Sequence, residues 1–246
     1  MRQAVRRHVL RLAIALGVAL SFPAQAEQGA IVFVAPVNDS MPLARFTDDV
    51  LEGGIIKDLG DAIAERMGLA ARYVSTPSAR VSEALNSGRA DCLCYALPEW
   101  LIGTFYWSDP VIEDAEEIAS RFDAPPIKTL ADLADEPVGT VIAYHYREVE
   151  AALGSHFRRE EAKTMELNIR KIVAGRMRYA IVEKLPFDYA LRHNPTGQVR
   201  VALVYAPVAA RCALSRGSAI EFSRFDAAVK SLIADGTVAR IMATYK

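Results

Sequence analysis

The sequence predicts an α/β protein built from mainly parallel sheets with helices on both faces. Short β-rich runs alternate with amphipathic helical segments along the chain, which is the pattern of parallel strands joined by crossover helices. Residues 90–96 are almost all apolar, as expected of a strand that is covered on both faces. From Ile56 to Met67 apolar residues recur at helical spacing, and Gly68 follows as a C-terminal cap.

The remaining elements are predicted from the same periodicities and from turn residues. Strands are predicted at residues 30–34, 72–74, 138–142, 179–182, 199–204 and 208–214. Helices are predicted at residues 77–88, 129–133, 147–153, 168–174, 186–192, 222–233 and 238–245. Residues 113–124 are interpreted as a connection, and the two prolines that follow them start a new unit.

The N-terminus is typical of a cleavable export signal. Four arginines precede an apolar segment over residues 12–21, and Pro23 and the small residues around Ala26 come next. We therefore expect residues 1–26 to be a signal peptide, with cleavage after Ala26 and export, in a bacterium, to the periplasm. The apolar segment is short for a membrane span, and no cysteine stands at the cleavage point, which argues against a lipoprotein anchor.

Length and charge narrow the function of the mature chain. Removing 26 of the 246 residues leaves enough chain for two modest lobes or one larger α/β domain. The signal peptide holds four of the 29 basic residues and none of the 30 acidic ones, so the mature net charge is −5. That charge, without a clustered basic face, argues against a nucleic-acid partner.

Several segments together resemble a known family. They are residues 54–59, 84–91, 105–110, 130–133 with 138–139, and 235–237 with Ile241 and Tyr245. Their order and spacing resemble those of the bacterial periplasmic solute-binding proteins of family 3, the soluble receptors of polar amino-acid ABC transporters. The resemblance covers almost the whole mature chain. It implies the type II periplasmic binding fold, in which two α/β lobes are joined by a two-segment hinge.

The resemblance also implies how the chain is divided. Lobe 1 would comprise residues 27–117 and 211–246, and lobe 2 residues 118–210. The hinge would lie near residues 117–122 and 205–211. Ligand capture would be closure of the lobes in a monomer about that hinge, through contacts that form only in the closed state.

Three cysteines would enter an oxidising compartment. Cys92 and Cys94 point to the same face of a predicted strand and are poorly placed to bond each other. In the resembling fold the strand around Cys212 returns beside that strand, so a bridge from Cys212 to one of the pair is conceivable. We expect buried free thiols, and we do not expect a zinc site, because no histidine cluster accompanies them.

The expected ligand clamp departs from the family pattern. The family places an Arg for the ligand carboxylate at the end of a segment that corresponds to residues 97–100, where this chain has Trp100. The family's acidic group corresponds to Lys184 in strict register, or to Glu183 after a slip of one residue. Its carboxylate-capping Ser or Thr corresponds to Tyr144. An ordinary amino acid is therefore expected to bind weakly or not at all.

Aromatic residues are expected to take over this site. Trp100, Tyr144, His145, Tyr146 and Tyr95 would form a stacking or cation–π pocket for a flat or cationic ligand. The alternative is that Tyr144 and Tyr146 are ordinary loop aromatics.

Two basic side chains are candidates for a replacement site that binds an anionic group of the ligand. Arg80 would act from the first turn of its helix, or Lys184 would act from lobe 2. Arg80 and His145 are also open to the alternative that they are simply solvated.

The sequence thus predicts a non-enzymatic receptor that passes a small polar or aromatic solute to an ABC permease. No catalytic triad, metal-ligand set or cofactor motif is recognised. One alternative is an enzyme on the same fold, similar to the cyclohexadienyl dehydratases, with Glu183, Lys184 and His145 as acid–base groups. Another is a module that reports solute binding to a membrane sensor.

Overall fold

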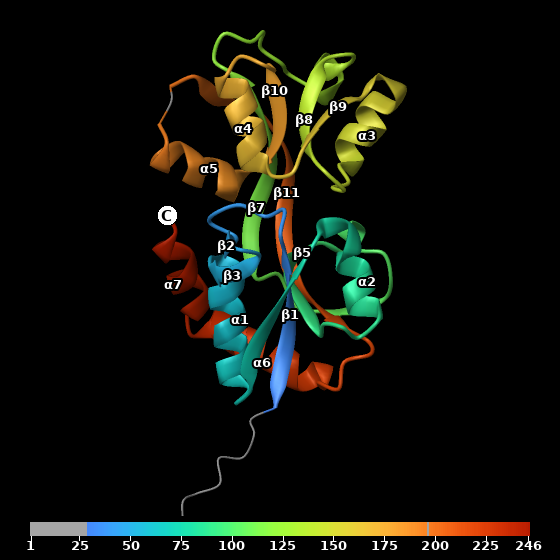
Figure 1. Ribbon diagram of the computed structural model, residues 1–246, viewed down its shortest axis with the longest axis vertical. Helices are drawn as coiled ribbons and strands as arrows, with labels where there is room; N and C mark the ends of the chain where they lie inside the picture. Colours follow the sequence, from blue (N-terminus) through green and yellow to red (C-terminus); the bar gives the residue numbers. More distant parts are fainter. Residues whose placement is uncertain (1–28, 196) are drawn as a thin grey trace, which may run out of the picture.

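The computed structural model describes residues 29–195 and 197–246, so the predicted signal peptide lies outside the described residues. Figure 1 shows two α/β lobes stacked along the long axis of the molecule. In this view lobe 1 is the lower lobe and lobe 2 the upper one, and two long strands run through both. Within the described part of the chain, no helix is both long and apolar enough to cross a membrane.

Lobe 1 is built from both ends of the described chain. Its strands are β1 (Ala30–Pro36), β2 (Arg45–Thr47), β3 (Val50–Gly53), β4 (Ala70–Thr76), β5 (Cys92–Ala96) and β6 (Phe105–Trp107). Its helices are α1 (Ile55–Arg66), α2 (Val81–Asn86), α6 (Phe222–Ala234) and α7 (Thr237–Thr244), with single 3₁₀ turns at Ser78–Arg80 and Pro98–Trp100.

Lobe 2 is built from the middle of the chain. Its strands are β8 (Pro137–Val141), β9 (Arg158–Ala162) and β10 (Tyr179–Glu183). Its helices are α3 (Arg147–Leu153), α4 (Met165–Val173) and α5 (Lys184–His193), with 3₁₀ turns at Leu130–Leu133 and Gly154–His156. The strands that link the two lobes are β7 (Ile112–Arg121) and β11 (Val199–Ser215).

All the strands except β2 and β3 form one sheet that passes through both lobes, and β2 and β3 pair in a separate two-stranded sheet. The order in the large sheet is β4-β1-β5-β11-β7-β10-β8-β9, and β6 also pairs with β11. The outer strands of each lobe are parallel, as the alternation of strands and helices predicted. The two linking strands pair with each other antiparallel, and each is antiparallel to its neighbour on the outer side. The sheet is therefore mixed, with parallel strands outside and an antiparallel centre.

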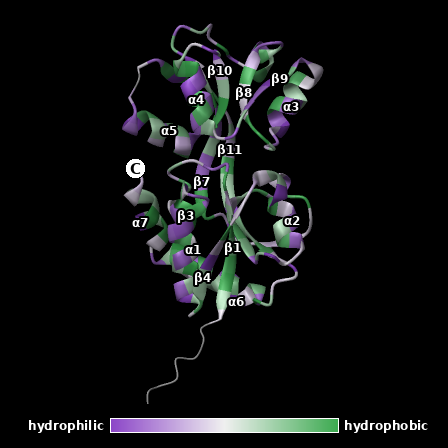
Figure 2. Cartoon of the chain, in the orientation of Figure 1, coloured by the Kyte–Doolittle hydropathy of each residue, from purple (hydrophilic) through white to green (hydrophobic). Residues whose placement is uncertain are grey.

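Hydrophobic clusters cover both faces of the sheet in each lobe, and Figure 2 shows β1 as strongly hydrophobic between partly hydrophilic helices. Helix α1 illustrates how the sequence produces this packing. Leu59 and Ile63 recur at helical spacing and are almost completely buried. Gly54 precedes the helix at φ +111°, and a Cβ there would lie 2.5 Å from the carbonyl oxygen of Leu43. Glycine is therefore required where α1 begins.

Three features differ from the sequence-based prediction. Residues 113–124 were predicted as a connection, but most of them form β7, whose acidic residues at 113–117 hide the pattern of a strand. The run at 199–214 is one long strand, not two. β9 and the hairpin of β2 and β3 were not predicted, because these short segments are largely exposed and carry few apolar residues.

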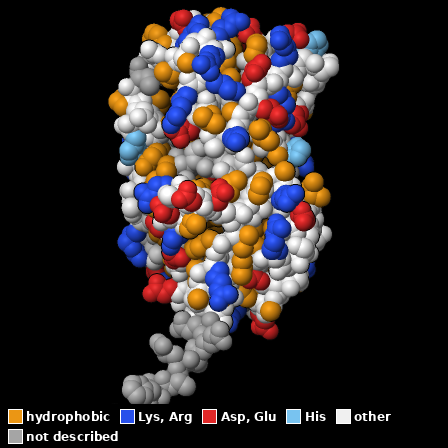
Figure 3. Space-filling model, in the orientation of Figure 1, with side chains coloured by type: hydrophobic (Ala, Val, Ile, Leu, Met, Phe, Trp, Pro, Cys, Tyr) orange, Lys and Arg blue, Asp and Glu red, His pale blue; other side chains and the backbone are white. Residues whose placement is uncertain are grey.

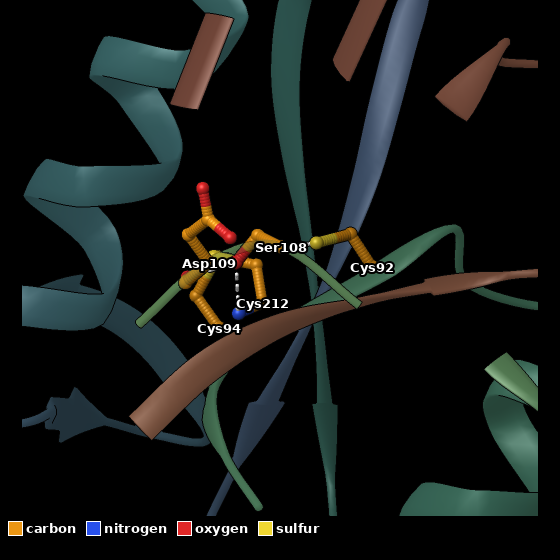
Figure 4. Close-up of a disulfide and its surroundings, with 5 residues drawn as sticks. All are labelled: Cys92, Cys94, Ser108, Asp109 and Cys212. Atoms are coloured by element: carbon orange, nitrogen blue, oxygen red, sulfur yellow. Dashed lines mark hydrogen bonds between the residues drawn. A yellow bond between two sulfur atoms is a disulfide. The ribbon is translucent and has the colours of Figure 1, made fainter. Parts of the chain in front are cut away.

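The expectation of three free thiols was wrong for two of them. Cys94 and Cys212 form a disulfide between β5 and β11 (Figure 4). The two residues are paired in register across the antiparallel ladder, which brings their side chains together. Cys92 remains a buried free thiol, with its Sγ 3.9 Å from that of Cys94. The nearby Ser108 accepts a 3.0 Å hydrogen bond from the Cys212 backbone amide and fixes β11 against the loop after β6.

Candidate functional site: the cleft between the lobes

A cleft of about 660 Å³, which includes space open to solvent, lies between the two lobes. Each lobe contributes aromatic and acidic side chains to it. The residues that line it are Pro36, Asp39, Ser78, Val81, Leu93, Tyr95, Trp100, Leu101, Glu116, Ala143, Tyr144, His145, Tyr146 and Glu183.

The lobe 1 wall is aromatic. Tyr95, near the end of β5, has its ring centroid 5.9 Å from that of Trp100 in the following 3₁₀ turn. Tyr95 is 8% exposed and adopts φ +64°, a backbone conformation that non-glycine residues rarely take. Its hydroxyl donates a 2.6 Å hydrogen bond to Oδ2 of Asp114 on β7. Packing and this bond hold the ring in place despite the unusual backbone.

The lobe 2 wall is formed by the loop after β8. Ala143 at φ +64° turns the chain, and the ring centroids of Tyr144 and Tyr146 lie 6.3 Å apart. The Tyr146 hydroxyl accepts a 2.9 Å hydrogen bond from the Val141 amide. Arg159 supports the loop from behind, with its guanidinium 5.5 Å from the centre of the Tyr146 ring and a 3.1 Å bond to the Tyr144 carbonyl. Two aromatic pairs therefore flank the cleft, one from each lobe.

Three carboxyl groups from three different elements face this aromatic cleft. Asp39 follows β1, Glu116 lies on β7 and Glu183 ends β10. Glu116 is 6% exposed and Glu183 is 8% exposed. Burial, together with the neighbouring Asp114 and Glu116, raises the pKa of Glu183 to about 8. Acidic groups are costly to bury without a cation, so these shifts indicate that the cleft lacks a neutralising partner.

The other two carboxyl groups are shifted for the same reason. Burial raises the pKa of Asp39 to about 7, partly offset by the hydrogen bond from Tyr144. Burial also raises the pKa of Glu116 to about 7, where the nearby Tyr205 hydroxyl opposes the shift and surrounding acids add to it. Protonation of all three carboxyl groups is therefore sensitive to pH near neutrality.

The two cations that the sequence suggested do not line the cleft. Lys184 opens α5 and its Nζ lies 2.5 Å from Oδ2 of Asp188, one turn further along the helix. Arg80 is exposed in the 3₁₀ turn before α2. Among the residues lining the described cleft there is no Lys or Arg. The structure therefore provides no replacement for the carboxylate-binding Arg within the cleft.

The lobes contact each other directly around the cleft. The Tyr144 hydroxyl donates a 2.8 Å hydrogen bond to Oδ1 of Asp39. Near the linking strands, Oδ1 of Asp114 accepts a 2.9 Å hydrogen bond from the Leu185 amide at the start of α5. Since Oδ2 of Asp114 also bonds Tyr95, this one side chain joins the lobe 1 wall to lobe 2. The two lobes are therefore in direct contact at Asp39 and at Asp114.

Of the residues singled out in the sequence, the structure brings Trp100, Tyr144, Glu183, Tyr95 and His145 to one cleft. Sequence reasoning did not single out Asp39 or Glu116. The position of Asp39 just after the first predicted strand could have indicated a site residue. Side chains at the carboxyl ends of strands often form the binding sites of α/β proteins. The sequence gives no comparable indication for Glu116, because residues 113–124 do not show the pattern of a strand and are interpreted as a connection.

The described residues contain one group of His, Cys, Asp or Glu side chains whose ligand atoms lie close enough to share a metal ion. It consists of the three cysteines, and the disulfide already uses two of their sulfur atoms. The cleft carboxyl groups do not form such a group, because their oxygen atoms do not all lie within 4.8 Å of one another.

Two α/β lobes joined by two linking strands, with a cleft lined from both, define the periplasmic-binding class of ligand-binding folds. The family model for "Bacterial extracellular solute-binding proteins, family 3" matches residues 33–246. The chain therefore belongs to this family. No match is found among curated proteins.

Solved structures show the same fold at low sequence identity. An ancestral arginine-binding protein bound to arginine is 19% identical, with a TM-score of 0.74 over 89% of this chain and 99% of that one. A histidine kinase sensor domain with similarity to periplasmic binding proteins is 24% identical, with a TM-score of 0.77 over 89% and 96%. The ancestral amino acid-binding protein AncCDT-1, described as a precursor of cyclohexadienyl dehydratase, is 18% identical, with a TM-score of 0.73 over 88% and 95%.

Proposed function

We propose that this protein is an exported receptor that captures a small polar or aromatic solute in the cleft and passes it to an ABC transporter. The observation that carries the proposal is the composition of the cleft, whose aromatic and acidic walls come from both lobes. A solute held between them contacts both lobes at once, so its binding energy favours the closed state. Family membership supports the receptor role, and the N-terminal export signal supports a periplasmic location.

We place the hinge in β7 and β11, near residues 117–122 and 205–211, between lobe 1 (27–117 and 211–246) and lobe 2 (118–210). The hydrophobic clusters support a crossing within these two hinge segments, because Ile118 packs in a lobe 2 cluster, whereas Val208 and Ala210, inside the second segment, already pack in a lobe 1 cluster. The ladder between the two strands also shifts register between Val204 and Ala206. An irregular ladder bends more readily than a regular one.

Binding without turnover is the first test. The protein, expressed from the full chain, is unfolded and refolded to remove any carried-over ligand, and is then screened for thermal stabilisation by amino acids, amines, aromatic acids and neutral aromatics. A ligand that binds only the folded state stabilises it by about 2.7 kcal/mol at a concentration of 100 times Kd. A saturable rise in Tm, with the compound recovered unchanged, supports a receptor. No stabilisation by any solute would count against solute capture.

A second candidate is an enzyme on the same scaffold. It is favoured by the pKa values of Asp39, Glu116 and Glu183, which lie near neutrality where acid–base catalysis is most effective. The likeness to AncCDT-1 shows that a structure described as a dehydratase precursor shares this fold. To distinguish an enzyme from a receptor, the stabilising compound is incubated with the protein and analysed by mass spectrometry. Conversion to a product would establish catalysis.

A further inference from the structure

We propose that the solute is an organic cation without a carboxylate: a protonated amine or guanidinium compound whose cationic and apolar parts fit between the two aromatic pairs. The inference rests on the proposed function, since it names the ligand class of the same cleft. It follows from which charges line the cleft, how they are paired and how they are arranged.

Charge is the first argument. Asp39, Glu116 and Glu183 line the cleft, and no Lys or Arg side chain joins them among its described lining residues. An amino-acid zwitterion needs a cation or several donors for its carboxylate as well as an acceptor for its ammonium group. In this cleft, a ligand carboxylate would face acidic side chains, with no Lys or Arg among the described lining residues to pair with it.

Two guanidinium groups close to the lining residues are already engaged. Arg159 lies behind Tyr146 and forms ion pairs with Glu150 and Glu161, at 3.5 and 3.3 Å. Arg147, beside the cleft, donates a 3.2 Å hydrogen bond to the Glu99 carbonyl. Recruiting either for a ligand carboxylate would break these contacts.

Pairing is the second argument. The Glu183 side chain faces the cleft while more than nine-tenths of the residue is buried. Within the described chain, its carboxyl group accepts a hydrogen bond from its own backbone amide and none from another side chain. A buried carboxyl group without a partner side chain is costly, and an N–H donor from a ligand removes that cost. Glu183 is therefore the group that we expect to anchor the cation.

Arrangement is the third argument. The three carboxyl groups do not converge within the 4.8 Å that a shared metal ion requires in the described structure. They line a cleft whose walls are the Tyr95–Trp100 pair and the Tyr144–Tyr146 pair. Aromatic faces attract organic cations through their quadrupole and also pack against the hydrocarbon part of the ligand. The cleft therefore suits an organic cation better than a bare ion.

Matched pairs of compounds test this inference. Agmatine, cadaverine and tyramine are compared with arginine, lysine and tyrosine, which differ from them by the carboxylate. Titration calorimetry on the refolded protein should show at least one amine binding at least tenfold more tightly than its parent amino acid. If every parent amino acid binds as tightly as its amine, the inference is overturned.

Substitutions test whether Glu183 is the side chain that binds the cation. Glu183→Gln keeps the shape of the side chain and removes its charge, and should weaken binding of the tightest amine at least tenfold. Glu160→Gln, on the exposed part of β9, is the matched control and should leave affinity within twofold of wild type. If Glu183→Gln is folded by circular dichroism and binds as wild type does, Glu183 is not the anchor and the inference fails. Glu116→Gln repeats the test if Glu183→Gln does not fold.

The wider screen separates this inference from the proposed function. Saturable binding of an anionic or neutral aromatic compound, with no amine binding, would overturn the proposed cationic ligand. The proposed receptor function would still hold. Failure of every compound to bind would overturn both.

Discussion

The hydroxyl of Tyr144 in lobe 2 lies 2.8 Å from Oδ1 of Asp39 in lobe 1, and this hydrogen bond crosses the cleft. It joins the loop after β8 to the loop after β1, two segments that belong to different lobes. Any opening of the cleft must break it. The bond therefore contributes to the balance between open and closed states, even without a ligand.

Tyr144→Phe removes this bond and keeps the ring. A typical hydrogen bond contributes about 1 kcal/mol, so the variant should shift the ligand-free equilibrium about fivefold toward the open state. Small-angle X-ray scattering should show a larger radius of gyration than for wild type. The control is Tyr146→Phe, whose hydroxyl bonds Val141 within lobe 2. It should lower Tm without changing the radius, and an equal radius for both variants would contradict the role of Tyr144.

The buried acids make the stability of the ligand-free protein dependent on pH. Burial raises the pKa of Glu183 from 4.5 to about 8, and those of Asp39 and Glu116 to about 7. Between about pH 5 and pH 8 the folded state therefore binds more protons than the unfolded state, and stability falls as pH rises. Above the folded pKa values this contribution becomes constant.

Thermal melts of the refolded protein across this range measure the effect. Tm should fall between pH 5 and pH 8, and Glu183→Gln should reduce the slope because glutamine does not titrate. A Tm that rises with pH over this window, or an unchanged slope in the variant, would contradict the assignment.

The disulfide joins residues 118 positions apart in the sequence. A crosslink over so long a loop restricts the unfolded chain strongly, and loss of a native disulfide typically costs about 2–5 kcal/mol. The double variant Cys94→Ser with Cys212→Ser should lose stability in this range in urea unfolding at neutral pH. Both cysteines are replaced together so that Cys92 cannot form a new bridge.

Cys92→Ala serves as the control for the disulfide, since Cys92 is the free thiol. It should cost less than the double variant. Alkylation of the denatured wild-type protein, followed by mass spectrometry, should detect one free thiol per chain. Detection of three thiols in the protein purified from an oxidising compartment would rule the bridge out.

The two tryptophans provide a reporter of the cleft, because Trp100 lines it whereas Trp107 packs against Phe105 in a lobe 1 cluster. Each single Trp→Phe variant leaves one indole in the chain. The compound that stabilises the protein most in the thermal screen should change the fluorescence of Trp107→Phe. The same compound should leave Trp100→Phe nearly unchanged, and the opposite result would place the ligand elsewhere.

The surface also bears on the choice of ligand. On the face that Figure 3 shows, Lys and Arg side chains are interspersed with Asp and Glu over both lobes, and no continuous basic area is seen. This face offers no extended electrostatic surface for a polyanion.

The sequence by itself determined much of the local structure and the family. Periodic apolar residues such as Leu59 and Ile63 define α1, and the segment at 147–153 coincides with α3, because helix formation depends on neighbours within a few residues. The aromatic residues Trp100 and Tyr144 were found through their motif positions, and both line the cleft.

Only the tertiary structure decided how distant groups are paired. It placed Asp39 against Tyr144, 105 residues away, and Cys94 against Cys212, 118 residues away. It also separated Glu183 from Lys184, neighbours between which the sequence did not choose, since Glu183 lines the cleft and Lys184 pairs with Asp188 outside it. The burial of a side chain, its pKa and its charge partner depend on contacts between remote segments. They therefore cannot be predicted from a local pattern of residues.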